Sequence, residues 1–290
     1  MLPLSQAHLT LLSTCDRKYQ HVFLNALSGP STLEQQATTQ WGSQFHLLMQ
    51  QRALNLPVEV LANADTEMVT SIAALEQAAP DVFEHLSAVS KVAERASDQA
   101  FCQSEHRRTL AFNGYLLTVV YDLLVCSSEA GQIFDWKTHQ HPPRRAWLQA
   151  DWQTRLYLYV LAETTNLGPE QLSMTYWFVR LGNSLEADAG PASNKREAER
   201  AQPTAYCFDY SAAQHQRTQR DLQQLTDRLT RMRQQHNFPK VDMEKGLCDR
   251  CPFNVRCDRI PSSAPLPATS YQLLQSASQL TVDQIEEIPL

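Results

Sequence analysis

Hydrophobic and polar positions divide the chain into a helical first part and a strand-rich middle. Apolar side chains recur at helical spacing through most of the first ninety residues, which predicts amphipathic helices. Ser5 is placed to cap a first segment that extends to about Leu27. Ser31 and Glu34 form a capping box before a second segment, and a third covers 66–90. We therefore expect a helical N-terminal region.

After residue 100 the pattern changes to short runs rich in aromatic and β-branched residues. Runs 101–112 and 115–126 flank Asn113-Gly114, and Asn-Gly between two such runs is the strongest local signal for a β-hairpin. The further expected elements are a strand at 132–138, a loop at 139–145, a helix at 146–166, strands at 172–180 and 204–210 around a polar loop at 183–203, and a helix at 211–236. This order predicts an α/β or α+β core preceded by helices.

Composition removes several classes of protein. With 43% hydrophobic and 19% charged residues, the 290-residue chain is not of the disordered type. The eight glycines are too widely spaced for a G-x-G-x-x-G motif or a P-loop, so a dinucleotide-binding enzyme or an ATP-driven helicase in the same chain is excluded. No apolar run approaches the length of a membrane span, and the N-terminus lacks a secretory pattern. We expect a cytoplasmic protein without membrane contact.

Hairpin geometry predicts a row of charged side chains across three strands. A two-residue turn at Asn113-Gly114 places Glu105 opposite Asp122, and a second turn near 127–131 places Asp122 opposite Asp135. Lys137 projects from the same face as Asp135, because it lies two residues further along the strand. Facing carboxylates repel each other in a sheet, and a buried carboxylate needs a partner or a metal ion.

This row has two interpretations. The aspartates could lie at strand ends in water, or they could converge to bind a divalent metal ion. Clustered carboxylates favour the second interpretation, and oxygen ligands suit Mg²⁺ or Mn²⁺. A lysine beside them can hold and polarise a water molecule, so the predicted reaction class is metal-assisted hydrolysis of a phosphodiester.

A second group of residues suggests another metal centre. Cys248, Cys251 and Cys257 follow the last predicted helix, and two thiolates in a C-x-x-C segment can reach one centre. Cys102, Cys126 and Cys207 fall in strand patterns and are expected to be buried. This leaves Cys15 as the candidate fourth ligand. The residues alone allow either Zn²⁺ or an iron–sulfur cluster.

The order of these motifs resembles the PD-(D/E)XK nuclease superfamily, and in particular its RecB-like and AddB-like branch with the iron–sulfur nucleases of CRISPR adaptation. Asp122 is followed by Asp135-Trp136-Lys137-Thr138, then by Gln153-x-x-x-Tyr157, and Gly42-x-x-x-His46 lies upstream. The resemblance implies that His46, Asp122, Asp135 and the Trp136 carbonyl bind metal. It implies that Lys137 is catalytic, that Glu105 supports the site, and that Gln153 and Tyr157 face the site or the DNA.

The same resemblance implies the fold, the second cofactor and the activity. The fold would be a restriction-endonuclease-like core with a central mixed β-sheet flanked by helices and a C-terminal cluster loop. Cys15, Cys248, Cys251 and Cys257 would bind a 4Fe–4S cluster that joins the two ends of a nuclease domain at 1–260. Residues 261–290 would be a linker and tail, with a short helix from Thr281.

The function that follows is an exonuclease acting on single-stranded DNA ends, with a separate helicase as a partner. Two alternatives compete with it. A non-catalytic DNA-binding or scaffold subunit would be marked by loss of an acidic residue or of the lysine, and both are retained. An electron-transfer or iron–sulfur sensor protein would leave the carboxylate row unexplained.

Overall fold

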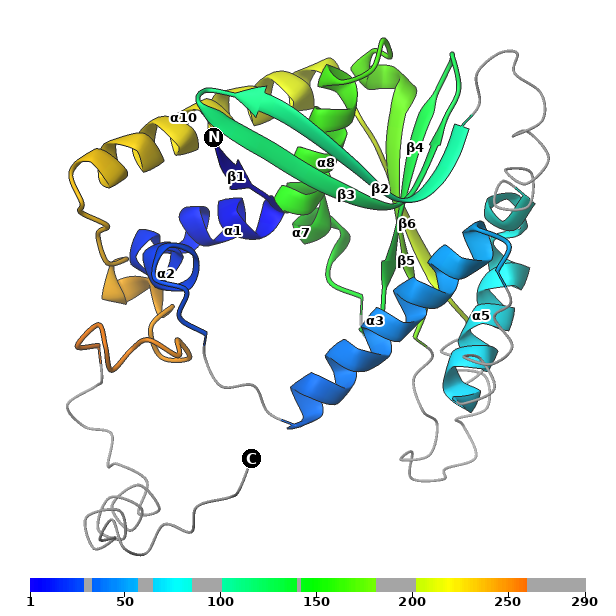
Figure 1. Cartoon of the computed structure of the whole chain (residues 1–290), viewed down its shortest axis with the longest axis horizontal. Coiled ribbons are helices and arrows are strands. Elements are labelled where there is room, and N and C mark those ends of the chain that lie inside the picture. The colour runs from blue at the N-terminus through cyan, green and yellow to red at the C-terminus, as the bar shows by residue number, and fades with distance from the viewer. Residues whose placement is uncertain (29–32, 57–64, 85–100, 140–141, 181–201, 260–290) are drawn as a thin grey trace, which may run out of the picture. The chain divides into compact units, whose positions relative to one another are not determined.

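A computed structural model describes residues 1–28, 33–56, 65–84, 101–139, 142–180 and 202–259 (Figure 1). The chain divides into two compact units, Met1–Pro239 and Lys240–Leu290. The first contains the sheet and the helices that pack on it. In the second, the described part holds the short 3₁₀-helix η4 (Met243–Lys245) and the three clustered cysteines. The predicted loop at 183–203, except for its last two residues, the Ser31 capping residue and the tail helix lie outside the described residues.

Six strands of the first unit form one mixed sheet. They are β1 (Leu2–Leu4), β2 (Phe101–Phe112), β3 (Tyr115–Cys126), β4 (Gly131–Lys137), β5 (Leu172–Phe178) and β6 (Thr204–Asp209). The sheet order is β1-β3-β4-β5-β6, and β2 also pairs with β3. β1 pairs with β3 and β4 with β5 in parallel, and the other pairs are antiparallel. This is the mixed sheet that the sequence and the resemblance predict.

The predicted hairpin register is confirmed. Phe112 pairs with Tyr115, and the antiparallel ladder continues to Phe101 opposite Cys126. Asn113 and Gly114 both have positive φ, 47° and 82°, as a tight turn of mirror-image type requires. The second turn pairs Cys126 with Gly131, so its register also agrees with the prediction.

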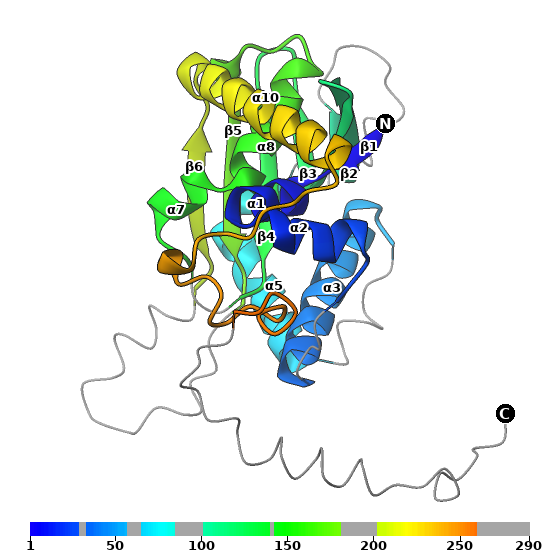
Figure 2. The ribbon, with the colours of Figure 1, turned by 90° about the vertical axis from the view of Figure 1, so that its left-hand side faces the viewer.

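One face of the sheet is covered by α1 (Gln6–Thr14), α7 (Arg145–Ala150), α8 (Trp152–Glu163) and α10 (Ala212–Gln234), and Figures 1 and 2 show these helices on the same side. Side chains that alternate along β3, such as Leu117 and Tyr121, point into this layer. Leu222, Leu229 and Met232 of α10 share one face of the helix and are buried against it.

The other face is covered by α3 (Leu33–Ala53) and α5 (Thr66–Ala78). Asp65 caps α5, because its side chain accepts the backbone N–H groups of Glu67 and Met68. Phe45 and Leu48 of α3 pack with Trp136 of β4 in this second core. The sheet is therefore covered by helices on both sides, and the candidate site lies where β3 and β4 separate beneath α3.

Three sequence predictions need correction. The first helix does not continue to Leu27, because Cys15 is extended and separates α1 from α2 (Asp16–Tyr19), which is followed by the π-helix η1 (Gln20–Leu24). The helix expected at 146–166 is interrupted at Asp151, whose side chain caps α8, and the second helix ends at Glu163. β1 is not predicted, since three residues are too short for a periodic signal. No helix in the described ranges is long and apolar enough to cross a membrane.

Candidate active site

The β3–β4 ladder ends where the two predicted aspartates begin. Its last pair is Leu123 with Phe134, and the next position would place Asp122 opposite Asp135. Instead, Oδ2 of Asp122 accepts a hydrogen bond from the backbone N–H of Trp136 at 2.7 Å. The carboxylate thus satisfies an amide that the parted strand leaves unpaired. This explains how an acidic side chain that is only 13% exposed is retained in the middle of an apolar strand.

Glu105 lies opposite Asp122 on β2 and has an unusual backbone. Its φ is 51°, in the left-handed region, which costs a non-glycine residue about 1–2 kcal/mol. The neighbouring Ser104 donates its hydroxyl hydrogen to the carbonyl oxygen of Asp122 at 2.8 Å. Backbone strain of this kind persists where the surrounding structure fixes it, and it is common at functional sites. Here it lies beside the charged side chains that the register predicts to meet.

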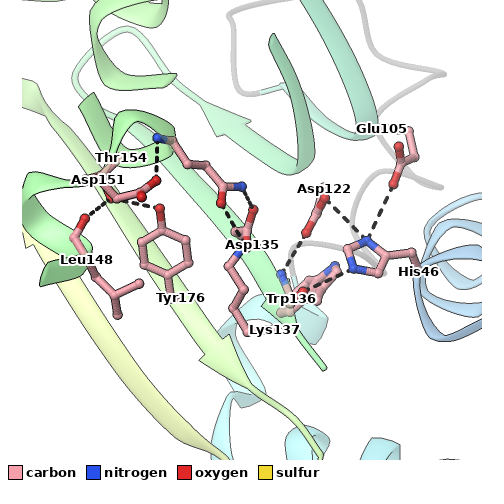
Figure 3. Close-up of polar contacts among 11 residues, drawn as sticks. His46, Glu105, Asp122, Asp135, Trp136, Lys137, Leu148, Asp151, Thr154 and Tyr176 are labelled. Carbon is pink, nitrogen blue, oxygen red and sulfur yellow. Dashed lines mark hydrogen bonds and ion pairs between the residues drawn. The ribbon is translucent and has the colours of Figure 1, made fainter. Parts of the chain in front are cut away.

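His46 reaches the strands from α3, on the second face of the sheet. A close approach of this helix depends on Gly42, because a Cβ atom at that position would lie 2.8 Å from Oγ1 of Thr138. Nε2 of His46 is 3.1 Å from the carbonyl oxygen of Trp136, and Nδ1 is 3.4 Å from Oδ1 of Asp122 and 4.0 Å from Oε1 of Glu105. Figure 3 shows the ring between these groups.

His46, Glu105 and Asp122 form a group of metal-ligating side chains. One ligand atom from each lies within 4.8 Å of the others. Burial alone lowers the pKa of His46, but the hydrogen bond to Asp122 and the charges of Asp122, Asp135 and Glu105 outweigh it, so the pKa is raised. Burial and the Asp122 charge raise the pKa of Glu105. Two carboxylates and an imidazole are donors that fit a divalent cation.

Asp135 and Lys137 form a second, connected group on β4. Nζ of Lys137 is 2.5 Å from Oδ2 of Asp135 and donates to Oε1 of Gln153 at 2.8 Å. The Gln153 amide in turn donates to Oδ1 of Asp135 at 2.5 Å. Burial, first, and the Asp122 charge, second, raise the pKa of Asp135, while Lys137 and His46 lower it in part. The structure therefore brings the predicted lysine, its aspartate and the predicted glutamine into one network.

The ligand group differs from the set that the resemblance implies. Glu105, expected in a supporting role, belongs to the group with His46 and Asp122. Asp135, expected as a ligand, has its two oxygens engaged by Lys137 and Gln153. The Trp136 carbonyl lies beside His46 as expected.

Tyr157 and Tyr176 lie beneath this network. Tyr157 is buried, and burial together with the charges of Asp135 and Asp122 raises its pKa. Tyr176 pairs with Asp135 across the β4–β5 ladder, and Nζ of Lys137 lies 5.0 Å from the centre of its ring. Its hydroxyl is 2.8 Å from Oγ1 of Thr154, which donates to the carbonyl of Leu148 at 2.6 Å (Figure 3). Tyr157 is among the sequence-predicted residues, whereas Tyr176 is not, because its strand pattern is that of any core tyrosine.

The cysteine predictions meet a less favourable geometry. None of the seven cysteines forms a disulfide. Cys15, Cys248, Cys251 and Cys257 are all half-buried, but within the described part of the chain no three cysteine sulfurs lie within 4.8 Å of one another. The geometry thus gives the iron–sulfur cluster no support. Cys126 is buried as expected, whereas Cys207 is exposed on β6, so the prediction of burial is wrong for that residue.

Comparisons with known proteins bear on this arrangement. Two of the solved structures that are similar to this chain illustrate the likeness. One is described as a "Putative exonuclease" from Eubacterium rectale, at 11% identity and TM-score 0.44 over 92% of this chain and 91% of that chain. The other is the protein SSO0001, at 12% identity and TM-score 0.34 over 89% and 87% of the two chains. Both likenesses are weak and support no conclusion about this chain. No curated protein sequence matches it significantly.

The comparison with protein families is decisive, because one family model matches residues 3–258 of the chain. This range contains every residue of the candidate site, and the expected superfamily is confirmed, although its RecB-like branch stays a prediction. Nucleases of this kind typically use divalent metal ions, with which the His46, Glu105 and Asp122 group is compatible. The chain belongs to the PD-(D/E)XK nuclease superfamily.

Proposed function

We propose that the chain is a divalent-metal-dependent exonuclease that hydrolyses phosphodiester bonds at the ends of single-stranded DNA. The observation that carries the proposal is the position of Lys137. Asp135 and Gln153 hold its ammonium group. Asp135 lies two residues before Lys137 on β4 and adjoins the group of metal donors. A cation fixed beside a group of metal ligands can orient a water molecule for the attack that metal-assisted hydrolysis involves.

The proposed roles follow from these contacts. His46, Glu105 and Asp122 would hold Mg²⁺ or Mn²⁺, together with the Trp136 carbonyl and with Asp135 once an ion competes for its oxygens. The ion would supply Lewis-acid stabilisation of charge on the phosphate. Lys137 holds and polarises the attacking water. The water oxygen bonds to phosphorus as the bond to the leaving oxygen breaks, one proton of the water passes to solvent, and the leaving oxygen takes up a proton from solvent. Gln153 fixes the direction of the lysine, and the Tyr157 hydroxyl faces the same network.

The test is cleavage of end-labelled single-stranded DNA with Mn²⁺, with Mg²⁺ and with EDTA. We expect metal-dependent loss of terminal nucleotides by the wild-type protein and none by Lys137→Ala. Lys18→Ala removes a lysine of α2 outside the site and is the matched control. A circular single strand of the same sequence should resist cleavage, because an exonuclease needs an end. Duplex DNA and RNA of equal length complete the set and report strand and sugar preference.

Three results would contradict the proposal. Cleavage that survives in Lys137→Ala at the wild-type rate would come from another enzyme. A folded protein that binds the single strand but never cleaves it would instead be a non-catalytic subunit, and a helicase partner would then be sought by co-purification. Cleavage of the circle would replace the exonuclease with an endonuclease.

We also propose that Cys15, Cys248, Cys251 and Cys257 bind a 4Fe–4S cluster. The support is the donor chemistry alone: three half-buried thiols in the C-x2-C-x5-C spacing and a fourth near the N-terminus. The measurement is iron and acid-labile sulfide in protein purified without oxygen, beside the Cys251→Ser variant and, as a control, Cys207→Ser. Four irons per chain that are lost only in the first variant would support the cluster. Zinc in place of iron would refute it.

A further inference from the structure

A groove on the helical face of the sheet plays no part in the site described above. It has a volume of about 840 Å³, within the range of about 300–1,000 Å³ typical of ligand sites. Three helical segments form it, and we name it the helical groove. The lining includes Ser13 and Thr14 of α1, Trp147 and Arg155 of α7 and α8, and Arg228 and Arg231 of α10. Figure 2 shows α1, α8 and α10 next to one another.

The aromatic lining of the groove has one fixed ring and one exposed ring. Trp152 is 7% exposed, its indole N–H donates to the hydroxyl of Ser13 at 2.7 Å, and the guanidinium of Arg155 lies 4.3 Å from its ring centre. Trp147 is 59% exposed. The open ring face of Trp147, with arginines beside it in a hollow, can stack on a nucleic-acid base.

The charge of the groove is complementary to an anion. Asp221 is occupied by an ion pair with Arg155, and Asp151 accepts the backbone N–H of Gln153. Arg228 pairs with Asp16 at 3.1 Å, yet its buried Nε has no hydrogen-bond acceptor among the described residues. Arg231 is exposed and forms no ion pair within the described ranges. Hydrogen bonds from Asn113 and Gln223 lower the pKa of Asp227, and the charge of Arg231 one helical turn away lowers it further.

Along α10 the excess of positive charge is larger. Between 211 and 237 there are five arginines and two aspartates. This stretch therefore presents guanidinium donors suited to phosphates.

One residue of the groove is a chain neighbour of a residue of the candidate active site. Trp152 in its floor directly precedes Gln153, which contacts both Lys137 and Asp135. A second hollow of about 350 Å³ shares Ala150 and Arg155 with the groove and reaches Arg217. Between Arg217 and Arg231, α10 extends about 21 Å at 1.5 Å per residue. This length accommodates several nucleotides of one strand.

We propose that the helical groove binds the single-stranded part of the substrate, with a base stacked on Trp147 and phosphates contacted by Arg228 and Arg231. The inference rests on the proposed function and adds where the strand lies outside the catalytic centre. An unpaired base is free to stack on Trp147, whereas the bases of a duplex are already stacked on one another, so a single strand fits this lining better. A protein partner would also favour tryptophan and arginine, and it is the competing occupant that the test separates.

The experiment measures binding of a fluorescein-labelled oligothymidine to the full-length protein by anisotropy, in EDTA to prevent cleavage. We expect Trp147→Ala to weaken binding about tenfold or more, and Trp147→Phe to retain most of the affinity because the ring face remains. Arg231→Ala should weaken binding several-fold and reduce the slope of log affinity against log salt by about 0.7. The control is Arg220→Ala, an exposed arginine of α10 that lines neither hollow. Melting temperatures of all variants verify folding.

The outcomes separate the groove from the activity. If the wild-type protein binds and cleaves DNA while both groove variants bind like Arg220→Ala, the groove inference is refuted and the nuclease remains, as a protein-binding groove would give. If the variants weaken duplex binding as much as single-strand binding, the single-strand assignment is wrong. If cleavage fails but binding depends on Trp147 and Arg231, the groove stands and the exonuclease proposal falls.

Discussion

Asp122 combines a structural and a chemical role that two substitutions can separate. Its Oδ2 accepts the N–H of Trp136, a residue that is 3% exposed, and its Oδ1 faces Nδ1 of His46. In Asp122→Ala the buried N–H loses its acceptor, which costs about 1–3 kcal/mol. In Asp122→Asn the new amide keeps an oxygen for Trp136 and turns its NH₂ toward His46. Relief of repulsion with Glu105 and Asp135 offsets part of any loss, so we expect a change within about 1 kcal/mol.

The two effects are measured as thermal unfolding and cleavage. For a unit of this size each kcal/mol shifts the melting temperature by about 2–4 °C. Asp122→Ala should therefore melt about 2–12 °C below the wild-type protein in EDTA, and Asp122→Asn close to it. Added Mn²⁺ at a hundredfold excess over Kd should stabilise the wild-type protein by about 2.7 kcal/mol and so raise its melting temperature. Neither variant should respond to Mn²⁺. In both variants the cleavage rate should fall by more than the roughly 10–100-fold that follows the loss of a residue that only orients a metal ligand.

The matched control is Asp81→Asn, an exposed aspartate outside the site, which should behave as the wild-type protein in every measurement. Equal destabilisation by Asp122→Asn and Asp122→Ala would show that the Trp136 hydrogen bond does not explain why the carboxylate is there. Retention of the Mn²⁺ response and of cleavage in Asp122→Asn would remove Asp122 from the proposed metal ligands.

Three further outcomes are expected. The raised pKa of Asp135 means that the folded state holds its proton more tightly than the unfolded state does, so metal-free protein loses stability as pH rises through that pKa. Asp135→Asn should therefore melt higher than the wild-type protein at alkaline pH and at the same temperature near pH 3. A difference in melting temperature that stays constant with pH would refute this. Tyr176→Leu removes the ring beneath Lys137 and should lower kcat with little change in KM, whereas Tyr176→Phe should keep most of kcat; equal loss in both would assign the effect to the hydroxyl. Gly42→Ala should displace α3 and reduce cleavage up to about 100-fold, and Thr138→Ala in the same chain should restore part of it, because Oγ1 of Thr138 is the atom that the new Cβ meets.

Local signals explain what the sequence predicts correctly. The Asn113-Gly114 turn and the period of two along the flanking runs determine the β2–β3 register, and the second turn determines that of β4. The register places Glu105 near Asp122, and Lys137 follows Asp135 on one strand face. These predictions succeed because neighbours in the chain determine turn type and side-chain direction.

Other features depend on contacts between distant segments. The break at Cys15, the strand β1 and the interruption at Asp151 carry no periodic signal. Tyr176 supports Lys137 only because β5 pairs in parallel with β4. Its sequence environment is that of an ordinary core tyrosine, so no local pattern could identify it.

The sequence by itself therefore determines the hairpin register, the carboxylate row and the spacing of Asp135 and Lys137, since each follows from local backbone geometry. The tertiary structure alone decides which charges converge. His46 joins the site because Gly42 lets α3 approach β4, and Glu105 enters the ligand group with a strained backbone. Asp122 becomes the acceptor for Trp136 because β3 and β4 part at that residue. Such contacts arise from packing between segments far apart in the chain, and hydrophobic periodicity does not encode them.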